Sequence, residues 1–473
     1  MQEKKVLDKT STGSMNDNDP DDFYVKHQKV YPRKVSGIFA RLRVLGVFLL
    51  LGGYYLIPWL QWNNQQAVLF DLPARKFYIF GLTFWPQDFF YLAALLIIAA
   101  LSLFFFTALA GRLWCGYACP QTVWTEVFLW IERKVEGSRN QQIKLDKQSF
   151  SLHKLGLKSL KHFLWITLSA WTGFTFVGYF TPITGLGTSI AQLALGPWET
   201  FWIIFYSFAT YGNAGWMREQ VCIYMCPYAR FQSAMFDKNT LIISYDEQRG
   251  ESRGSRKKSS NPEELGLGDC VDCSLCVQVC PTGIDIRDGL QYQCIGCAAC
   301  ADVCDEVMQK MNYEKGLVRY TTQNIIDGKS STILRPRIIV YAVLLLLISS
   351  ALVYSIATRI PLELDIIRDR NALYRETNEG LIENIYTLKL INMDTQEHSY
   401  QLAISGLDNM VFIKPKSPIK INAGEVINYP VRIQIDPVNL SKTINTIHFE
   451  LRAIDKVNLT VTEKARFIGP TAR

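Results

Sequence analysis

Eight cysteines in the second half of the chain form one motif that is written twice. The motif is C-x2-C-x2-C-x3-C, and its copies are Cys270, Cys273, Cys276, Cys280 and Cys294, Cys297, Cys300, Cys304. In two-cluster [4Fe–4S] sites with this spacing, three cysteines of a run bind one cluster and the fourth binds the other. The sequence therefore predicts two [4Fe–4S] clusters, one bound by Cys270, Cys273, Cys276 and Cys304 and the other by Cys294, Cys297, Cys300 and Cys280.

The residues around the two runs favour clusters over other metal sites. Pro281 follows the first run, whereas Asp305 stands in the corresponding place after the second, where we expect a different local turn and the same ligands. Gly296, Ala298 and Ala299 are small enough to let backbone N–H groups approach cluster sulfurs. Structural zinc sites use C-x2-C pairs, which disfavours zinc. Two clusters in so short a segment favour electron transfer over a purely structural role, for which one cluster would be enough.

A second cysteine repeat, C-x-Y-x-C-P, occurs at residues 115–120 and 222–227, and its cysteines are Cys115, Cys119, Cys222 and Cys226. Cysteines four residues apart can share a helical face, but the proline disfavours helical geometry at the second cysteine. We therefore expect each motif to mark a helix end or a sharp turn. The four thiols, our candidate catalytic residues, could hold Cu(I), a further iron–sulfur cluster or a redox-active dithiol. The matching form of the two pairs disfavours the alternative of buried structural cysteines.

The surroundings of these four thiols bear on their charge. Near a lipid boundary, burial raises the pKa of a thiol unless a nearby cation compensates. Arg112, Arg218 and Arg230 are the candidates for that compensation.

Long apolar segments predict that the chain crosses a bilayer five times. The predicted spans are Ile38–Leu60, Asp88–Ala110, Leu160–Phe180, Trp198–Trp216 and Ile338–Ala357. Lysines and arginines gather before the first span, between the second and third, and between the fourth and fifth, whereas residues 181–197 contain neither. By the positive-inside rule, the N-terminus and the cysteine-rich segment face the cytoplasm and the C-terminus is exported.

The end of the chain has a different pattern. Short runs that alternate apolar and polar residues, such as VINYPVRIQI and TIHFELRAI, predict an all-β sandwich. We expect a multi-domain membrane protein with five transmembrane helices, a bacterial-type 2[4Fe–4S] ferredoxin-like insert and a C-terminal immunoglobulin-like β-sandwich. The predicted parts are a cytoplasmic tail (1–36), a four-helix membrane domain (37–249), a cytoplasmic ferredoxin domain (250–336), a fifth transmembrane helix (337–358) and an exported immunoglobulin-like domain (359–473).

Composition excludes several other classes of protein. The formal net charge of +7 does not indicate nucleic-acid binding, because most basic residues flank apolar blocks and no recognition module is visible. The twelve cysteines fall in tight groups and end at Cys304, which predicts reduced, metal-binding thiols in the cytoplasm. The five histidines form no paired set for a membrane b-haem, and no dinucleotide fingerprint occurs.

These motifs together resemble the CcoG family, also called FixG or RdxA. The resemblance rests on the run QAVLFDLPARKFYIFGLTFWPQDFFYLAALLIIAALSLFFFTALAGRLWCGYACPQTVWTEVFLWIERKVEG, the second C-x3-C-P motif, the paired cluster motifs and the β-rich tail, in that order. It covers nearly the whole chain after about residue 30. The resemblance implies a polyferredoxin that reduces Cu(II) to Cu(I) for cbb3-type cytochrome c oxidase in bacterial inner membranes. It also implies that the eight cysteines are cluster ligands and that the other four belong to membrane motifs of less settled role.

We therefore expect an iron–sulfur electron-transfer protein of the bacterial inner membrane, an oxidoreductase that holds copper at the membrane cysteine pairs. Its expected partners are the membrane, oxidase-assembly or copper-handling proteins, and a cytoplasmic electron donor that the sequence does not name. Two alternatives stay open at this point. One is a quinone-linked electron conduit to a periplasmic reductase, and the other is a non-enzymatic assembly scaffold.

Overall fold

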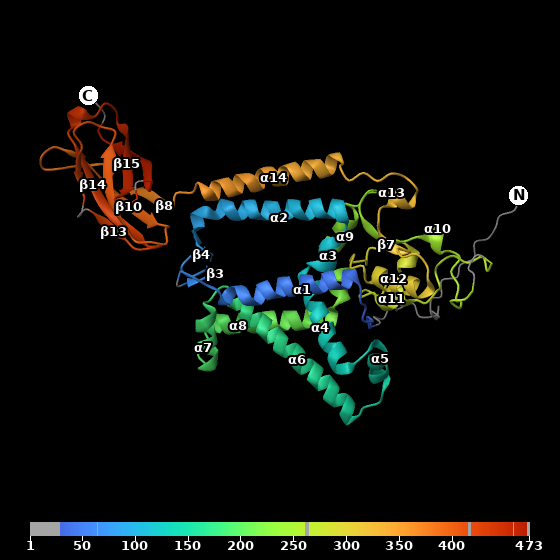
Figure 1. Cartoon of the computed structure of the whole chain (residues 1–473). Coiled ribbons are helices and arrows are strands. Elements are labelled where there is room, and N and C mark those ends of the chain that lie inside the picture. The colour runs from blue at the N-terminus through green and yellow to red at the C-terminus, as the bar shows by residue number, and fades with distance from the viewer. Residues whose placement is uncertain (1–28, 64, 261–263, 415–417, 457, 471–473) are drawn as a thin grey trace, which may run out of the picture.

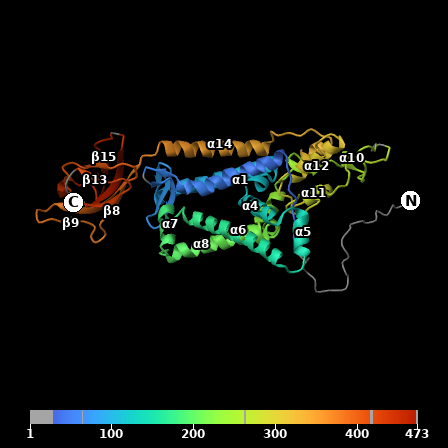
Figure 2. The same cartoon turned by 60° about the horizontal axis from the view of Figure 1, so that its bottom comes forward.

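The computed structural model of the chain describes residues 29–63, 65–260, 264–414, 418–456 and 458–470, without the side chains of Arg230 and Ser233. Several long helices run between two compact parts of the molecule (Figure 1). A cysteine-rich part lies at one end of these helices and a β-sandwich lies at the other, as a second view also shows (Figure 2). Residues 1–28 of the predicted tail lie outside the described residues.

Three helices of the described chain are long and apolar enough to cross a membrane, whereas the sequence predicts five. They contain α1 (Ile38–Leu56), α2 (Phe89–Ala110) and α14 (Pro336–Ala357). A helix of 22 residues, such as α14, rises about 33 Å, which matches the hydrocarbon thickness of a bilayer. Helices α2 and α14 pack along each other.

The other two predicted spans are corrected by the structure. The predicted span Leu160–Phe180 falls mostly in α6 (Leu152–Val177), which is not among the candidate spans and carries three lysines in its first three turns. The predicted span Trp198–Trp216 divides into α8 (Pro197–Thr210) and the π-helical segment η3 (Tyr211–Met217). The 14 residues of α8 rise only about 21 Å, less than the hydrocarbon core requires.

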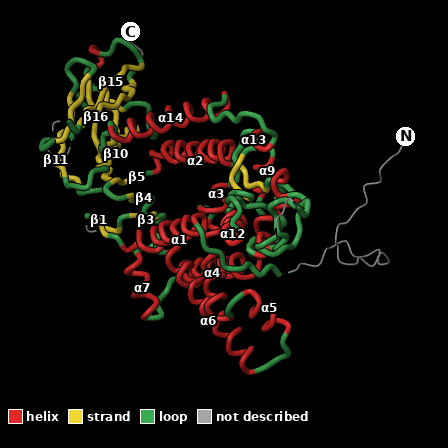
Figure 3. Tube along the Cα trace, turned by 45° about the vertical axis from the view of Figure 1, so that its right-hand side comes forward, coloured by secondary structure: helices red, strands yellow, loops and turns green. Residues whose placement is uncertain are grey.

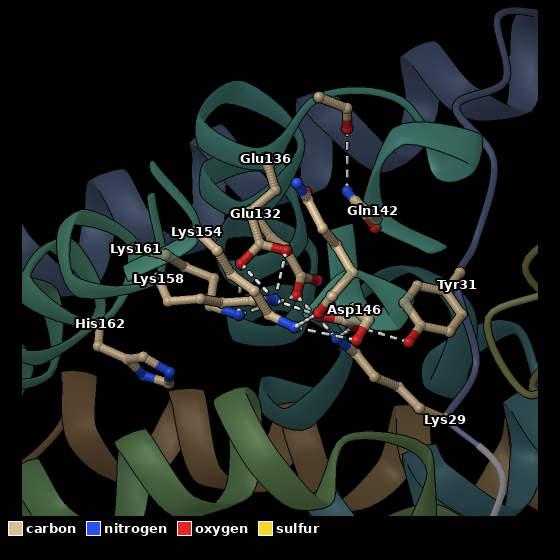
Figure 4. Close-up of polar contacts among 12 residues, drawn as sticks. Lys29, Tyr31, Glu132, Glu136, Gln142, Asp146, Lys154, Lys158, Lys161 and His162 are labelled. Carbon is tan, nitrogen blue, oxygen red and sulfur yellow. Dashed lines mark hydrogen bonds and ion pairs between the residues drawn. The ribbon is translucent and has the colours of Figure 1, made fainter. Parts of the chain in front are cut away.

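The lysines of α6 belong to a buried network of ion pairs (Figure 4). Lys161 Nζ lies 3.3 Å from Glu132 and 2.8 Å from Glu136. Lys158 Nζ lies 2.9 Å from Glu136 and 2.5 Å from Asp146. The side chains of Lys161, Glu132 and Glu136 are at most 5% exposed, so the pairing offsets the cost of removing these charges from water. Charges that the sequence assigns to membrane topology therefore join α6 to the two helices before it.

Shorter helices connect the long ones and surround the second cysteine repeat. They are α3 (Leu113–Tyr117), α4 (Pro120–Glu136), α5 (Arg139–Lys147), α7 (Ile183–Ala191), the π-helical η4 (Val221–Met225) and α9 (Pro227–Ser233). Helix α4 packs against α1, α6 and η3. It therefore links the first membrane helix to the α6–α8 pair.

The cysteine-rich part consists mostly of loops (Figure 3). Its elements are β6 (Ile242–Tyr245), α10 (Glu247–Gly250), α11 (Leu275–Gln278), η5 (Ile286–Asp288), α12 (Ala299–Met311), β7 (Val318–Thr321) and α13 (Gln323–Ile326). Strands β6 and β7 pair antiparallel, with Ile242 opposite Thr321. Strand β6 precedes residue 250, so this part also uses residues ahead of the predicted ferredoxin boundary.

The C-terminal part is a sandwich of two antiparallel sheets, as the alternating pattern predicts. One sheet has the order β12-β14-β10-β8 with β9 beside β10, and the other has the order β13-β11-β15-β16. The strands are β8 (Leu362–Arg368), β9 (Arg375–Glu376), β10 (Ile382–Asn392), β11 (His398–Ser405), β12 (Val411–Ile413), β13 (Ile419–Ile421), β14 (Val426–Ile435), β15 (Ile444–Ala453) and β16 (Thr460–Ile468). Alternate residues of these strands, among them the fully buried Tyr386 and Phe449, form one core between the sheets.

A small sheet joins the sandwich to the membrane helices. It consists of β3 (Val68–Asp71), β4 (Lys76–Ile79) and β5 (Leu82–Phe84), and a two-stranded pair, β1 (Gln61–Trp62) and β2 (Gln65–Gln66), precedes it. The ammonium of Lys76 donates to the carbonyl of Gly424 at 2.7 Å. Trp85 packs with Ile391 and Met393 of the sandwich.

His398 provides a test of how the sandwich is held together. The His398 ring lies between Asp455, 2.6 Å from Nδ1, and Asp394, 3.1 Å from Nε2, and Lys456 also pairs with Asp394. Burial opposes protonation of this ring, but the two carboxylates outweigh it and raise the pKa of His398 above 6.5. The imidazolium therefore stabilises the sandwich fully below a pH of about 6.5, and this contribution disappears as the pH rises through the raised pKa.

We predict that His398→Gln exposes β11 and β15 to hydrogen exchange more than in the wild type at pH 6. The difference should shrink above pH 8, after correction for intrinsic exchange rates. The measurement is hydrogen–deuterium exchange mass spectrometry of the full chain. An equal difference at both pH values would contradict the charged role of His398.

Candidate metal centres

The two cysteine runs adopt the same backbone turn twice. Asp272 and Gly296, each two residues after the first cysteine of its run, have φ angles of 51° and 68°. Ser274 and Ala298, two residues further on, have φ angles of 53° and 55° and lead into α11 and α12. Left-handed backbone at Asp, Ser and Ala costs free energy and persists where the surroundings require it, often at functional sites. The sequence repeat is therefore also a repeat in three dimensions.

Each predicted ligand set lines one small cavity. Cys270, Cys273, Cys276 and Cys304 line the first cavity. Cys294, Cys297, Cys300 and Cys280 line the second. The fourth cysteine of each run thus lies beside the three close cysteines of the other run. Cys276 lines both cavities, which are therefore neighbours.

Asp305 has a structural reason to replace proline. Cys304 and Asp305 both lie inside the 13-residue α12, whereas Cys280 and Pro281 follow the end of α11. Proline inside a helix removes a backbone hydrogen bond and clashes with the preceding turn. The Asp305 carboxylate instead accepts a hydrogen bond of 2.8 Å from the backbone N–H of Gly316.

The donor sets fit a cluster better than a single ion. In the described part of the chain, no three or more Cys, His, Asp or Glu side chains are close enough together to hold one metal ion. A cube of four irons and four sulfurs is much wider than an ion, so its four thiolates stand apart around it.

In the second repeat, each C-P step begins a helix. Cys119 is the residue before α4, Cys226 is the residue before α9, and both have extended backbone. Pro120 and Pro227 occupy the first helical position, where the missing N–H costs nothing. The predicted sharp turn is confirmed at both places.

The first cysteines of this repeat pack against the second cavity. Cys115 and Cys222 contact a buried cluster that contains Cys297, Ile295 and Ala299. The approach is close at α3, where a Cβ added to Gly116 would lie 2.8 Å from the carbonyl oxygen of Gly296. Two cysteine motifs that are far apart in the sequence are therefore in direct van der Waals contact.

Three side chains, Arg112, Arg43 and Tyr320, bond to carbonyl oxygens of the second cluster-binding run and hold it in place, a role that the sequence does not predict for them. Arg112 donates through Nη1 to the carbonyl of Cys294 at 2.9 Å and through Nη2 to the carbonyl of Ala229 at 2.5 Å. Arg43 donates to the carbonyl of Cys297, and the Tyr320 hydroxyl donates to that of Gly296 at 2.5 Å. Arg43 interrupts an apolar helix, which is a visible signal, whereas nothing in the sequence marks Tyr320.

The cysteine-rich part also caps the first membrane helix. The Asp302 carboxylate accepts hydrogen bonds from the backbone N–H groups of Phe39 at 3.2 Å and Ala40 at 2.7 Å. These N–H groups have no partner within the helix, and a negative charge at a helix N-terminus is favourable. A side chain at Gly37 would collide with Asp302, which explains the glycine.

Burial raises the pKa of three thiols of the second repeat, those of Cys115, Cys119 and Cys222. Burial raises the pKa of Cys115 to about 12, and the neighbouring thiols of Cys119 and Cys222 raise it further than Arg112 lowers it. Burial likewise raises the pKa of Cys222 to about 12. Arg112 is thus the compensating cation near these thiols. Arg218 instead pairs with Glu132 at 2.9 Å, and the Arg230 side chain lies outside the described residues.

Three family models match the chain. Residues 217–323 match a 4Fe-4S dicluster domain and residues 92–137 match a 4Fe-4S binding domain. Residues 352–470 match the Ig-like fold at the C-terminal end of FixG. The first two matches support iron–sulfur clusters, and the third supports an immunoglobulin-like sandwich.

Relatives match most of the chain. The nitrogen fixation protein FixG of Rhizobium meliloti is 38% identical over 81% of this chain and 80% of its own length. Protein RdxA of Cereibacter sphaeroides is 39% identical over 81% of this chain and 83% of its own length. Protein RdxB of the same organism is 38% identical over 88% of this chain and 91% of its own length. A crystal structure of a FixG-related protein from Vibrio parahaemolyticus matches 23% of this chain and 95% of that chain, with 37% identity and a TM-score of 0.21.

The contact at Gly116 leads to a prediction. Gly116→Ala should lower the iron content to about half, because its Cβ would push against the loop of only one cluster-binding run. The measurement is iron and acid-labile sulfide per chain, with the melting temperature.

Gly156→Ala is the matched control, since an added Cβ at Gly156 in α6 meets nothing within 4 Å. It should keep its iron and melt at the wild-type temperature or slightly above it. Full iron content in Gly116→Ala would show that the contact does not position the loop.

Proposed function

This chain belongs to the CcoG family, also called FixG or RdxA, and on that premise we propose that it reduces Cu(II) to Cu(I) for assembly of cbb3-type cytochrome c oxidase. It is an iron–sulfur electron-transfer protein, and copper is its substrate. The protein acts in the bacterial inner membrane, with the cysteine-rich part in the cytoplasm and the β-sandwich in the periplasm. Its partners are oxidase-assembly or copper-handling proteins.

One observation carries this proposal, namely the order in which the cysteines lie. Cys273 of the first cavity is exposed to solvent. Cys276 lines both cavities, and Cys115 and Cys222 pack against the buried apolar group that contains Cys297 of the second cavity. The cysteines therefore follow one another from solvent, through two small neighbouring cavities, to the second repeat at the end of the membrane helices. Such a series suits electron transfer. Clusters with a purely structural role would not need an exposed cysteine at one end or further cysteines at the membrane end.

We assign the cluster ligands by cavity. Cys270, Cys273, Cys276 and Cys304 bind one cluster, and Cys294, Cys297, Cys300 and Cys280 bind the other. When bound, each [4Fe–4S] cluster supplies a one-electron redox centre. Arg43, Arg112 and Tyr320 bond to carbonyl oxygens of the second run, so they hold that run against the membrane thiols.

Cys115, Cys119, Cys222 and Cys226 are the groups that meet copper in this proposal. Thiolates are soft ligands that favour Cu(I). Because burial raises the pKa of Cys115 and Cys222, copper must displace the protons of these two thiols on binding, which weakens its hold. Weak binding suits a substrate that has to leave, and it agrees with the lack of a closed single-ion site in the described residues.

A further iron–sulfur cluster at these four cysteines is the second candidate. It is favoured by the 4Fe-4S binding model that matches residues 92–137, which include Cys115 and Cys119. In that case copper would be reduced elsewhere, and loss of these cysteines would remove iron from the protein.

The crossed assignment of the fourth cysteines predicts the outcome of two double variants. Cys270→Ala with Cys304→Ala should keep about half the iron, because both changes remove ligands of one cluster. Cys270→Ala with Cys280→Ala should lose nearly all the iron, because it removes a ligand from each. Iron per chain and EPR of the reduced proteins are the measurements, and the reverse result would refute the crossed assignment.

The copper proposal predicts fast reoxidation of the dithionite-reduced protein by Cu(II). Anaerobic stopped-flow absorbance, with EPR, should show the clusters reoxidised and one Cu(I) formed per electron. Cys115→Ser and Cys222→Ser should slow this step by about tenfold or more while keeping the wild-type iron content.

The same two variants separate the alternatives. Clusters that stay reduced in excess Cu(II) would rule out copper reduction by this protein. Loss of iron in Cys115→Ser would instead support the additional cluster.

A further inference from the structure

A large cavity lies along α1. It has a volume of about 630 Å³, within the range of small-molecule sites. Its wall on α1 extends from Ala40 to Tyr55, a rise of about 22 Å. Val44, Val47 and Leu51 make this wall apolar. A ligand with a long apolar chain could therefore lie along a helix that is itself a candidate membrane span.

The other end of the cavity is polar and lies beside cysteines of both motifs. Cys222 and Cys297 are part of its wall, as are Gln121 and Thr122 at the start of α4. A ligand head group at this end would be adjacent to both cysteine motifs.

Arg218, one of the residues in the cavity wall, indicates that the head group carries a hydrogen-bond acceptor. Its side chain is 7% exposed, and its Nη1 has no hydrogen-bond partner in the described part of the chain. Its other donors are used, Nη2 by Glu132 at 2.9 Å and Nε by the carbonyl of Gly215 at 2.8 Å. A buried donor without a partner costs about 1–3 kcal/mol, so an acceptor from a ligand would relieve a real penalty.

The backbone at Arg218 is unusual as well. Its φ angle is +44°, and it lies between the π-helical segments η3 and η4. Both features occur preferentially at functional sites, because the surrounding fold must maintain them. Glu132, which belongs to the buried ion-pair network of Figure 4, fixes the guanidinium from behind.

Charge decides between a neutral and an anionic head group. Five basic residues line the cavity, namely Arg33, Lys34, Arg43, Arg133 and Arg218. Arg218 and Arg133 already pair with the carboxylates of Glu132 and Glu126, Arg133 at 2.8 Å, and Arg43 donates to the carbonyl of Cys297. A phosphate bound at Arg218 would need a cation whose charge is not already paired, whereas a carbonyl oxygen requires only a hydrogen-bond donor. We propose that this cavity binds a membrane quinone, with a ring carbonyl at Arg218 and the isoprenoid chain along α1. Its value as an electron donor or acceptor site rests on the proposed function, but its existence does not.

Two neighbouring glycines of α1 provide matched variants. Gly52 lines the cavity, and a Cβ added there meets nothing within 4 Å, so Gly52→Leu should fill the space without a clash. Gly53 is not among the lining residues, and its added Cβ makes only an ordinary contact with Ile57 at 3.9 Å. Gly53→Leu is therefore the control for helix propensity and added bulk.

The test is photolabelling of the full chain in phosphatidylcholine nanodiscs with an azido-quinone that carries an isoprenoid tail, followed by peptide mapping. We expect label on α1 and α4 that excess decylubiquinone removes and phosphatidylglycerol does not. Gly52→Leu should lower this label by about tenfold, and Gly53→Leu should leave it unchanged. Arg218→Leu should also lower it, but Gly52→Leu leaves the ion pairs intact and so decides the question if Arg218→Leu misfolds.

Three results would overturn the proposal. They are equal labelling of α1, α2 and α14, labelling in Gly52→Leu that matches the wild type, and competition by phosphatidylglycerol but not by decylubiquinone. The last would identify an anionic lipid site. Quinone labelling needs neither copper nor turnover. A protein that fails to reduce copper in the stopped-flow experiment would therefore not, for that reason, give any of these three labelling results.

Discussion

The contact between the second cluster-binding run and Gly116 of α3 is the constraint on which the rest of this structure depends. It brings backbone atoms of Gly296 and Cys297 against α3, so no side chain fits between them. Arg112 closes the contact by bonding to the carbonyl of Cys294 on one side and of Ala229 on the other. A buried guanidinium with carbonyl partners on two separate segments is costly to displace. The contact thus sets the position of the cysteine-rich part on the membrane helices.

Other interactions extend the same attachment. Asp302 supplies the negative charge at the start of α1, so the cysteine-rich part completes a helix that belongs to the membrane part. At the opposite end, Lys76 and the packing of Trp85 against Ile391 and Met393 attach the β-sandwich. The helices therefore lie between the cysteine-rich part and the β-sandwich, as Figures 1 and 2 show, and specific contacts attach them at both ends.

Two kinds of ionisable group are buried near the membrane, and their surroundings differ. Glu132, Glu136 and Lys161 each have a partner of opposite sign within an ion-pair distance. The thiols of Cys115 and Cys222 lack enough positive charge nearby, so burial keeps them protonated. The first arrangement is suited to holding helices together. The second leaves thiols that only a soft metal or a cluster would deprotonate.

The sequence by itself determined the features that depend on neighbours along the chain. The cysteine spacing predicts two cluster-binding runs, each C-P step predicts a helix end or a sharp turn, and the alternation after residue 359 predicts the sandwich. The spacing also predicts which fourth cysteine joins which run, and tertiary structure realises this crossing, because Cys280 and Cys304 come beside the other run only after the segment folds back. Tertiary structure alone decided where the lysines of α6 find their partners, which lie on α4 and α5. Arg112 and Cys294, 182 residues apart, illustrate the reason, which is that such contacts depend on the packing of every element between them.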